Sequence, residues 1–329
     1  MMAHRTHVAT AGPARKFACG ALIWLALACP PAGADVVLYQ ATVPLAGTAE
    51  ADRVAAFGEA LKVAAVRASG RSDAGASPAI AGAAAAPATY VQQYATTSDR
   101  MLKVGFDGRA MERLLQQAGL PLWPAERPAT TILLFLPAVA GAARAVTAAD
   151  RPPERAELER AAANRGVPLE WPAETVDLAA ARSRAAAAGT KGAVLVGAPA
   201  GAGYDWTFGH AGQSARGQGG LASGLGLAAD ALASRYAPGS TRSQQTVPVL
   251  IGGLDDVQSY AALTRYLESL SLVRAVSLRA LSGSAAQFDL EVRGDLELLR
   301  RIVALDGRLA PAPRSESPAA EAPDFVWRP

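Results

Sequence analysis

Cysteine and histidine are scarce in this chain, and their positions exclude several kinds of chemistry. The two cysteines, Cys19 and Cys29, and two of the three histidines lie in the segment before Asp35, which leaves His210 alone in the remainder. If this first segment is removed, the rest can build neither a disulfide nor a cysteine nucleophile, a Cys/His zinc site or an iron–sulfur cluster. A Ser-His-Asp triad would need His210. The classes of function that remain are carboxylate acid–base chemistry, Ser/Lys catalysis and no catalysis at all.

An excess of one charge is also missing from most of the chain. There are 32 Lys and Arg residues against 29 Asp and Glu residues, and the segment before Asp35, with Arg5, Arg15, Lys16 and no acidic residue, accounts for the whole difference. A neutral chain has no strong electrostatic attraction for nucleic acid or for an anionic membrane. We therefore expect no nucleic-acid partner.

The N-terminal segment, from Met1 to Ala34, has the pattern of a cleavable export signal. Basic residues precede an apolar run from Phe17 to Ala28, and this run is shorter than the ~20 residues that a membrane-spanning helix needs. The small residues Ala32-Gly33-Ala34 then favour cleavage after Ala34. The pattern predicts a periplasmic protein whose mature form has no transmembrane span.

A second processing site competes with this one. Ala26-Leu27-Ala28-Cys29 partly matches a lipoprotein box, in which Cys29 would carry a lipid anchor. Ala26 replaces the usual leucine, and Pro30 is an unusual residue after the cysteine. We favour cleavage after Ala34 and keep lipidation at Cys29 as the alternative.

Hydrophobic periodicity predicts a multi-domain α+β and α/β protein with three units. The first, residues 35–125, is a small α+β unit of order β-α-α-β-β-α. Its predicted strands are 36–43, 90–97 and 102–106, and its helices are 51–67, 77–86 and a third that Asp107 caps and that ends at Gln117.

The second unit, residues 129–238, is predicted to be a small α/β domain. Apolar runs at 131–136 and 192–197 are typical of strands covered on both faces, and helices are expected at 153–164 and 176–188. Residues 204–208 alternate with period two, which predicts a strand. A glycine-rich bend and a closing helix at 221–236 are expected after it.

The third unit, residues 244–310, has the order β-α-β-β-α-β of a ferredoxin-like split unit. Its predicted strands are 247–251, 272–281, 285–293 and a last one near Leu309, and its two helices are capped by Asp255 and Asp295. Residues 311–329 form a Pro/Ala-rich tail, and its part from Pro311 to Pro323 reads as a linker. Phe325-Val326-Trp327 at its end either docks as an extra strand or stays mobile.

The chain also resembles a family of exported proteobacterial proteins, the domain of unknown function 2066 family. The motifs that carry the resemblance are Val66–Gly70, Tyr90–Tyr94, Val104–Asp107, Gly119–Trp123 with Arg127-Pro128, and Ala229–Tyr236. The chain departs from that family at Pro124, where glycine is usual, and at Phe135, where tryptophan is common. The resemblance implies a shared export signal and fold over most of the mature chain, but it brings no activity and no catalytic residues.

Two sequence features suggest chemistry and have simpler explanations. Gly217–Ala222 matches the G-x-G-x-x-A pattern that cradles a pyrophosphate, but the polar residues Gln213–Arg216 before it do not read as a buried strand, so we interpret it as a flexible turn. His210 lies five residues after Asp205, which allows at most one acid–base pair. A lone histidine is more often a turn or surface residue than a catalyst.

Arg67, Trp123 and Arg127 are the candidate binding residues, because they are the most distinctive residues at the junction of the first two units. Clefts between domains commonly bind ligands. The competing interpretation is structural: Trp123 packs between domains, and Arg127 pairs with a carboxylate or caps a row of carbonyls. We favour the structural interpretation and keep the binding groove as the alternative.

No catalytic residue, metal site or cofactor is predicted. The favoured hypothesis is a non-enzymatic binding or scaffold component of the cell envelope, with a protein partner there. One alternative is a hydrolase of sugar or peptidoglycan bonds, which requires two carboxylates ~5 to 9 Å apart. Another is a small-ligand carrier, which requires an apolar pocket near Trp123.

Overall fold

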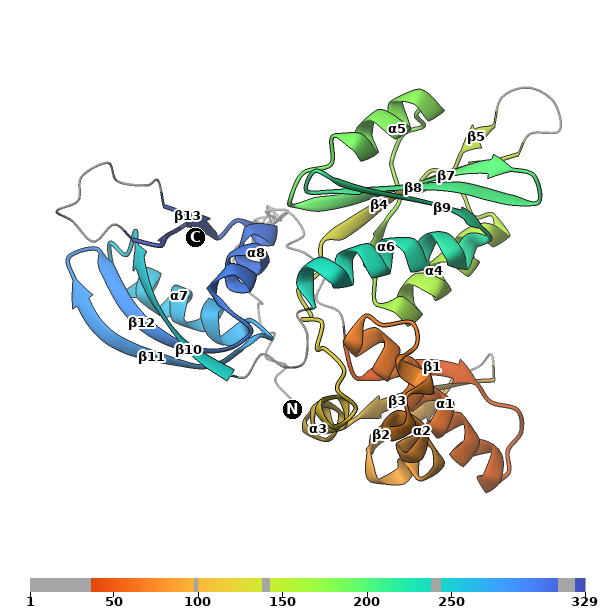
Figure 1. Cartoon of the computed structure of the whole chain (residues 1–329), viewed down its shortest axis with the longest axis horizontal. Coiled ribbons are helices and arrows are strands. Elements are labelled where there is room, and N and C mark those ends of the chain that lie inside the picture. Colours follow the sequence, from red (N-terminus) through yellow and green to blue (C-terminus); the bar gives the residue numbers. More distant parts are fainter. Residues whose placement is uncertain (1–36, 98–99, 138–142, 238–243, 313–322, 329) are drawn as a thin grey trace, which may run out of the picture. The chain divides into compact units, whose positions relative to one another are not determined.

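A computed structural model describes residues 37–97, 100–137, 143–237, 244–312 and 323–328, all of which belong to one compact unit, Ala32–Pro329. The predicted signal segment, with Cys29 and the cleavage site after Ala34, lies outside the described residues. Three separate sheets with their helices confirm the α+β multi-domain architecture (Figure 1). Within the described ranges, no helix is long and apolar enough to cross a membrane.

The first sheet is antiparallel, with strand order β1-β3-β2. Its strands are β1 (Gln40–Pro44), β2 (Val91–Thr96) and β3 (Met101–Phe106), and its helices are α1 (Glu50–Ser69), α2 (Pro78–Ala85) and α3 (Gly108–Gln117). The carboxylate of Asp107 accepts a hydrogen bond from the Ala110 amide at 2.7 Å, which is the predicted cap of α3. β1 begins later than expected, because residues 38–39 form a turn, and the carbonyls on either side of it, of Val37 and Gln40, accept hydrogen bonds from the Arg67 guanidinium.

The middle sheet has the order β5-β4-β7-β8-β9, with β6 also beside β4. Its strands are β4 (Ala129–Leu136), β5 (Arg144–Ala145), β6 (Leu169–Glu170), β7 (Gly192–Ala200), β8 (Gly203–His210) and β9 (Gln213–Gly219). The helices α4 (Pro153–Arg165) and α6 (Leu221–Tyr236) cover one face, and α5 (Leu178–Ala186) covers part of the other (Figure 1). β4 and β7 are parallel, as their continuous apolar sequences predict.

Residues 213–219 form the strand β9, so the predicted glycine-rich bend and flexible turn are wrong for this segment. Residues 213–219 pair in full register with β8, from His210↔Gln213 to Tyr204↔Gly219. An edge strand that is covered on one face does not need an apolar sequence. The polar residues of β9 therefore gave no strand pattern in the sequence. The bend is confined to Ala211 and Gly212, which both have positive φ.

The third sheet has the order β11-β12-β10-β14-β13. Its strands are β10 (Gln244–Gly252), β11 (Val273–Ser282), β12 (Ala285–Arg293), β13 (Leu309–Pro311) and β14 (Phe325–Trp327), with the helices α7 (Val257–Ser269) and α8 (Leu296–Asp306). The predicted β-α-β-β-α-β order is present. The capping residue of α7 is Asp256 and not Asp255, because the Asp256 carboxylate accepts the Ser259 amide at 2.6 Å.

The end of the predicted tail is part of this third sheet. β14 lies between β10, to which it is parallel, and β13, to which it is antiparallel. Its side chains Phe325 and Trp327 are 1% and 5% exposed, so they belong to the core. Of the two alternatives for Phe325-Val326-Trp327, docking as an extra strand is therefore the one present, whereas residues 313–322 of the predicted linker lie outside the described part.

Candidate functional site

The structure brings the predicted binding residues Arg67, Trp123 and Arg127 into one group, here called the junction cluster. The Arg127 guanidinium lies over the Trp123 indole, with its central carbon 3.7 Å from the ring centroid. Arg127 also donates hydrogen bonds to four backbone carbonyls: Pro124 at 2.9 Å, Gly166 at 2.7 Å, Arg67 at 2.8 Å and Trp123 at 3.3 Å. These carbonyls lie at the last turn of α1, in the connection to β4 and at the end of α4.

Arg127 of the junction cluster is fully buried, and Arg67 is half-buried. Burial lowers the pKa of Arg127 to about 9, with a further contribution from the Arg67 charge, and burial lowers the pKa of Arg67 to about 10. Arg67 donates to the carbonyls of Val37, at 3.1 Å, and Gln40. Both guanidinium groups thus donate hydrogen bonds to backbone carbonyls instead of pairing with carboxylates.

The junction cluster is closed to solvent at its centre. Trp123 and Arg127 are both 0% exposed. A Cβ at Gly70 would lie 2.9 Å from the Trp123 ring, and one at Gly166 would lie 2.0 Å from the Arg127 guanidinium, so glycine is needed at both positions. A ligand could reach Trp123 or Arg127 only by displacing side chains that are already packed.

His210 and Asp205 do not meet. They are five residues apart on β8, so their side chains point to opposite faces of the sheet. His210 is 2% exposed, with Nδ1 2.9 Å from the Gly192 carbonyl and Nε2 2.8 Å from the Tyr236 hydroxyl. A carbonyl only accepts, so Nδ1 carries the proton and Nε2 accepts from Tyr236. Burial lowers the pKa of His210, which holds it neutral inside the fold.

The G-x-G-x-x-A segment is held in place by Trp206. Gly217 and Gly219 belong to β9, and Gly220 is the N-terminal cap residue of α6. The indole N–H of Trp206 donates to the carbonyls of Gly219 and Gly220 at 3.3 and 3.2 Å. A Cβ at Gly224 would lie 2.3 Å from the Trp206 ring, so the helix packs directly on the indole. Gly224, just after the segment, therefore permits close packing of α6 on β8.

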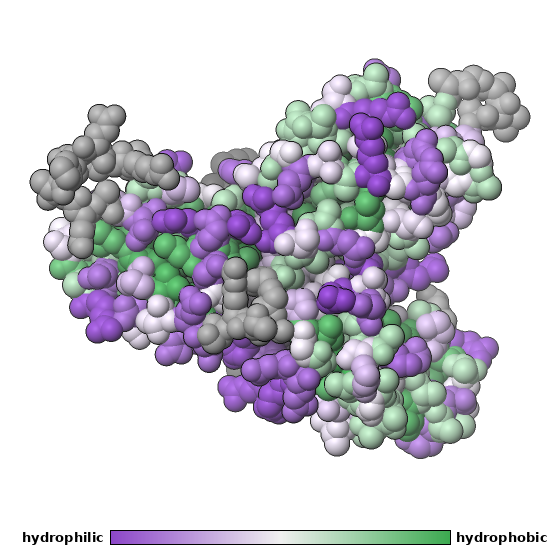
Figure 2. Space-filling model, in the orientation of Figure 1, coloured by the Kyte–Doolittle hydropathy of each residue, from purple (hydrophilic) through white to green (hydrophobic). Residues whose placement is uncertain are grey.

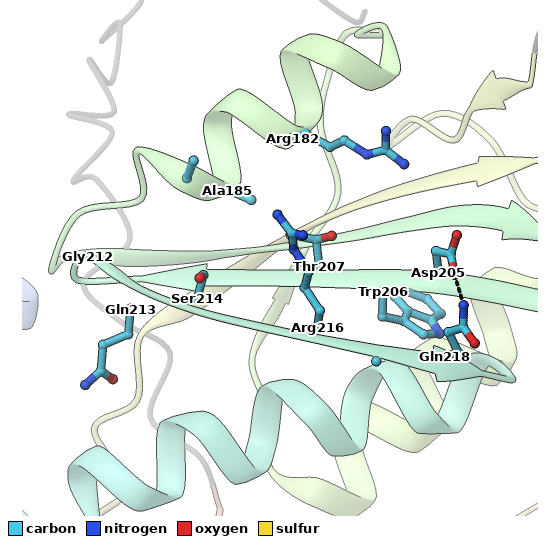
Figure 3. A pocket seen from close by; sticks show the side chains of 12 residues that line it. Arg182, Ala185, Asp205, Trp206, Thr207, Gly212, Gln213, Ser214, Arg216 and Gln218 are labelled. Atoms are coloured by element: carbon cyan, nitrogen blue, oxygen red, sulfur yellow. Dashed lines mark hydrogen bonds between the residues drawn. The ribbon is translucent and has the colours of Figure 1, made fainter.

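An open groove, which no sequence pattern indicated, lies on the opposite face of the β8–β9 hairpin. This β8–β9 groove has a volume of about 670 Å³, and α5 forms one of its walls (Figure 3). Its side-chain floor comes from the paired residues Asp205↔Gln218 and Thr207↔Arg216. Figure 2 shows hydrophilic side chains over this part of the middle sheet. The remaining lining residues are Arg182, Ala185, Ala186, Trp206, Gly212, Gln213, Ser214 and Gly217.

The position of α5 explains why the groove is open. A Cβ at Gly209 would lie 1.7 Å from the Ala185 carbonyl, so glycine lets α5 rest directly on β8 at that point. Beneath the helix, Ala181 and Ala185 pack with Leu133, Phe135 and Val196. The short helix ends at Ala186 and does not cover the polar residues nearer to the β9 edge.

The charges of the groove are not balanced. Arg182 and Arg216 are both exposed and, within the described ranges, neither guanidinium group has a hydrogen bond or an ion pair. Asp205 is the only carboxylate among the lining residues, and it accepts a hydrogen bond from the Gln218 amide at 2.7 Å (Figure 3). Two guanidinium groups against one carboxylate give the groove a net positive charge. The alternation of Asp205 and Thr207 with apolar residues was visible in the sequence, but the pairing with β9 was not.

Comparison with known proteins gives one family match. A model described as Domain of unknown function (DUF8605) matches residues 34–124, the part of the chain that holds β1, α1, α2, β2, β3 and α3. No curated protein and no solved structure matches the chain. The inferred resemblance to the domain of unknown function 2066 family is therefore wrong. Three of its five motifs lie at a helix end, an edge strand and a helix cap, where local structure favours particular residues in any family.

Proposed function

We propose that this chain is an exported, non-enzymatic binding component of the bacterial cell envelope, and that it binds a negatively charged partner in the β8–β9 groove. The periplasmic location follows from the signal pattern of the segment that ends at Ala34. The observation that carries the proposal is the pair of arginines, Arg182 and Arg216, that line one groove without an acidic partner of their own in the described part of the chain.

Physical chemistry favours an anionic partner over a neutral one. Guanidinium groups bind carboxylates and phosphates through paired hydrogen bonds. Thr207 and Ser214 add hydroxyl groups to the same lining. Exposed charges gain little from a single contact in water, so affinity would come from several such contacts made together.

The hydrolase alternative has less support at this groove. A glycoside hydrolase uses two carboxylates on either side of the bond that it breaks. Asp205 is the single carboxylate in the lining, and its oxygen is already bonded to Gln218. His210, the other titratable candidate, faces the opposite side of the sheet.

The scarcity of cysteine provides a direct test. Because Cys19 and Cys29 both precede Ala34, a chain cleaved there and carrying Ser214→Cys has one thiol, at the groove, and a photo-crosslinker can be attached to it. The matched control is Ser183→Cys, an exposed serine on α5 that does not line the groove. We expect envelope extracts to give a discrete cross-linked product with Ser214→Cys and none with Ser183→Cys.

Charge reversal completes the test. Adding Arg182→Glu and Arg216→Glu to the Ser214→Cys protein should abolish the product, and salt well above the physiological ~0.15 M should weaken it, because exposed charges are screened. The same product from both cysteine variants, or one that survives charge reversal, would contradict the proposal. Thermal unfolding of each variant checks that the fold is retained.

A further inference from the structure

The β9 strand offers a second feature beside the groove, which is an open sheet edge. β9 is the last strand of the middle sheet, with β8 as its neighbour on the inner side. In the described part of the chain, no backbone or side-chain group pairs with the outer edge of residues Ser214 to Gln218. Free N–H and C=O groups on a sheet edge are a template for another extended chain.

The hairpin geometry shows which residues present those groups. Ala211 and Gly212 have φ values of 50° and 75°, as in a two-residue type I′ turn, which closes on the hydrogen-bonded pair His210↔Gln213. Hydrogen-bonded and non-hydrogen-bonded pairs then alternate along the ladder. Ser214, Arg216 and Gln218 fall in the non-hydrogen-bonded pairs, so their backbone groups point outward.

The same three residues line the groove. Ser214, Arg216 and Gln218 alternate along β9, so their side chains share one face of the sheet, and that face is the floor of the β8–β9 groove. In an added antiparallel strand, the residue opposite Arg216 would form main-chain hydrogen bonds with it and place its own side chain on the groove side. The open edge and the positive groove would therefore bind one and the same segment.

We propose that the partner of the β8–β9 groove is an extended acidic protein segment that adds to β9 as an antiparallel strand. This inference rests on the proposed anionic-partner function and specifies its partner. The acidic residues stand opposite Arg216 and opposite Ser214, two positions apart. A neutral residue stands opposite Gln218, because Asp205 is directly across from Gln218 and would repel a carboxylate.

Charge also excludes a second copy of this chain as the occupant. An antiparallel pair of β9 edges centred on Arg216 would place one Arg216 directly opposite the other, and like charges in that position are destabilising. Arg182 of each copy would add to the repulsion, since it lines the same groove. Pairing of β9 with an acidic strand is therefore favoured over pairing of two β9 edges with each other.

Short synthetic peptides with blocked ends can distinguish strand addition from simple charge attraction. They are tested on the protein purified from a native-like bacterial host. The first peptide carries glutamates at two alternating positions among threonines, and the second has the same composition with adjacent glutamates. Two further versions of the first carry N-methyl groups, either on the glutamate amides or on the amides between them. Fluorescence anisotropy measures each affinity.

The alternating peptide should bind at least about tenfold more tightly than the adjacent one, which amounts to ~1.4 kcal/mol. Methylation of the glutamate amides, which face β9, should weaken binding about tenfold, whereas methylation of the intervening amides should change it less than about twofold. On the protein side, Ser214→Pro removes an outward N–H and leaves the β8 ladder intact, since proline is tolerated on edge strands. It should weaken binding of the alternating peptide about tenfold, as methylation of the glutamate amides does, without lowering the melting temperature by more than a few degrees.

The controls separate this inference from the proposed function. Arg216→Gln should lose peptide binding, and Arg184→Gln, on α5 but outside the groove lining, should retain it. Equal binding of both methylated peptides would overturn strand addition, although arginine-dependent cross-linking at Ser214→Cys would still support an anionic partner. Failure of the alternating peptide to bind, together with loss of that cross-linking, would overturn both.

Discussion

Arg127 and Trp123 form a stacked pair in which the guanidinium carbon lies 3.7 Å from the centroid of the indole ring, and both side chains are completely buried. The positive charge faces the ring on one side and backbone carbonyls around its edge. A cation held in this way joins α1, the connection to β4 and the end of α4 through the main chain. Its removal would leave several carbonyl groups buried without a donor.

Arg127→Met should therefore destabilise the protein strongly. Hydrogen bonds that involve a charged group contribute about 1.5–3 kcal/mol, so we expect the free energy of unfolding to fall by roughly 3 kcal/mol in urea denaturation. Arg127→Lys should recover only part of this loss, because an ammonium group cannot reproduce the planar fork of donors. Arg184→Gln is the surface control. A loss below about 1 kcal/mol for Arg127→Met would contradict the packing role.

Gly209→Ala should disturb α5 and the groove that it borders. The added methyl group would lie 1.7 Å from the Ala185 carbonyl, so the helix must shift. Overpacking of this kind costs about 1–3 kcal/mol, and we expect thermal unfolding at a correspondingly lower temperature. Gly189→Ala, where a Cβ meets nothing within 4 Å, is the matched control. Equal stability of the two variants would show that α5 does not rest on β8 at Gly209.

His210 should make stability depend on pH below neutrality. Its pKa is lowered in the folded state, so between that pKa and the unfolded value of about 6.5 the unfolded chain binds more protons than the folded chain. The stabilisation by neutral His210 is thus complete above about pH 6.5, and it is lost as the pH falls through the folded pKa. Urea denaturation between about pH 7.5 and pH 5.5 should show this loss in the wild type. His210→Gln should be less stable at the higher pH and should show a shallower dependence; equal slopes would refute the assignment.

The C-terminal strand β14 should be essential for stability. Trp327 is 5% exposed and packs against Tyr266, with the ring centroids 5.4 Å apart. Truncating a buried aromatic residue to alanine costs about 3–5 kcal/mol, so Trp327→Ala should lower the free energy of unfolding by that amount. Val326→Ala, at a half-buried position of the same strand, should cost clearly less. If both variants unfolded like the wild type, β14 would not be part of the folded core in solution.

Local sequence determined much of the secondary structure and excluded several kinds of chemistry. The carboxylates of Asp107 and Asp295 cap α3 and α8 as predicted, and Gly70 ends α1 in the left-handed conformation that favours glycine. These signals act over a few residues, so they can be read without a partner. The absence of cysteine after Ala34 likewise required no structure.

The tertiary structure alone decided the features on which the proposals depend. β9 is polar and half exposed, so it is a strand only because β8 pairs with it. β14 occupies a place between β10 and β13 that no local pattern could assign. Arg182 and Arg216 are far apart in the chain and line one groove because α5 rests on Gly209 of β8. Strand pairing and side-chain proximity join distant residues, and a local sequence pattern does not record which distant residue will be the partner.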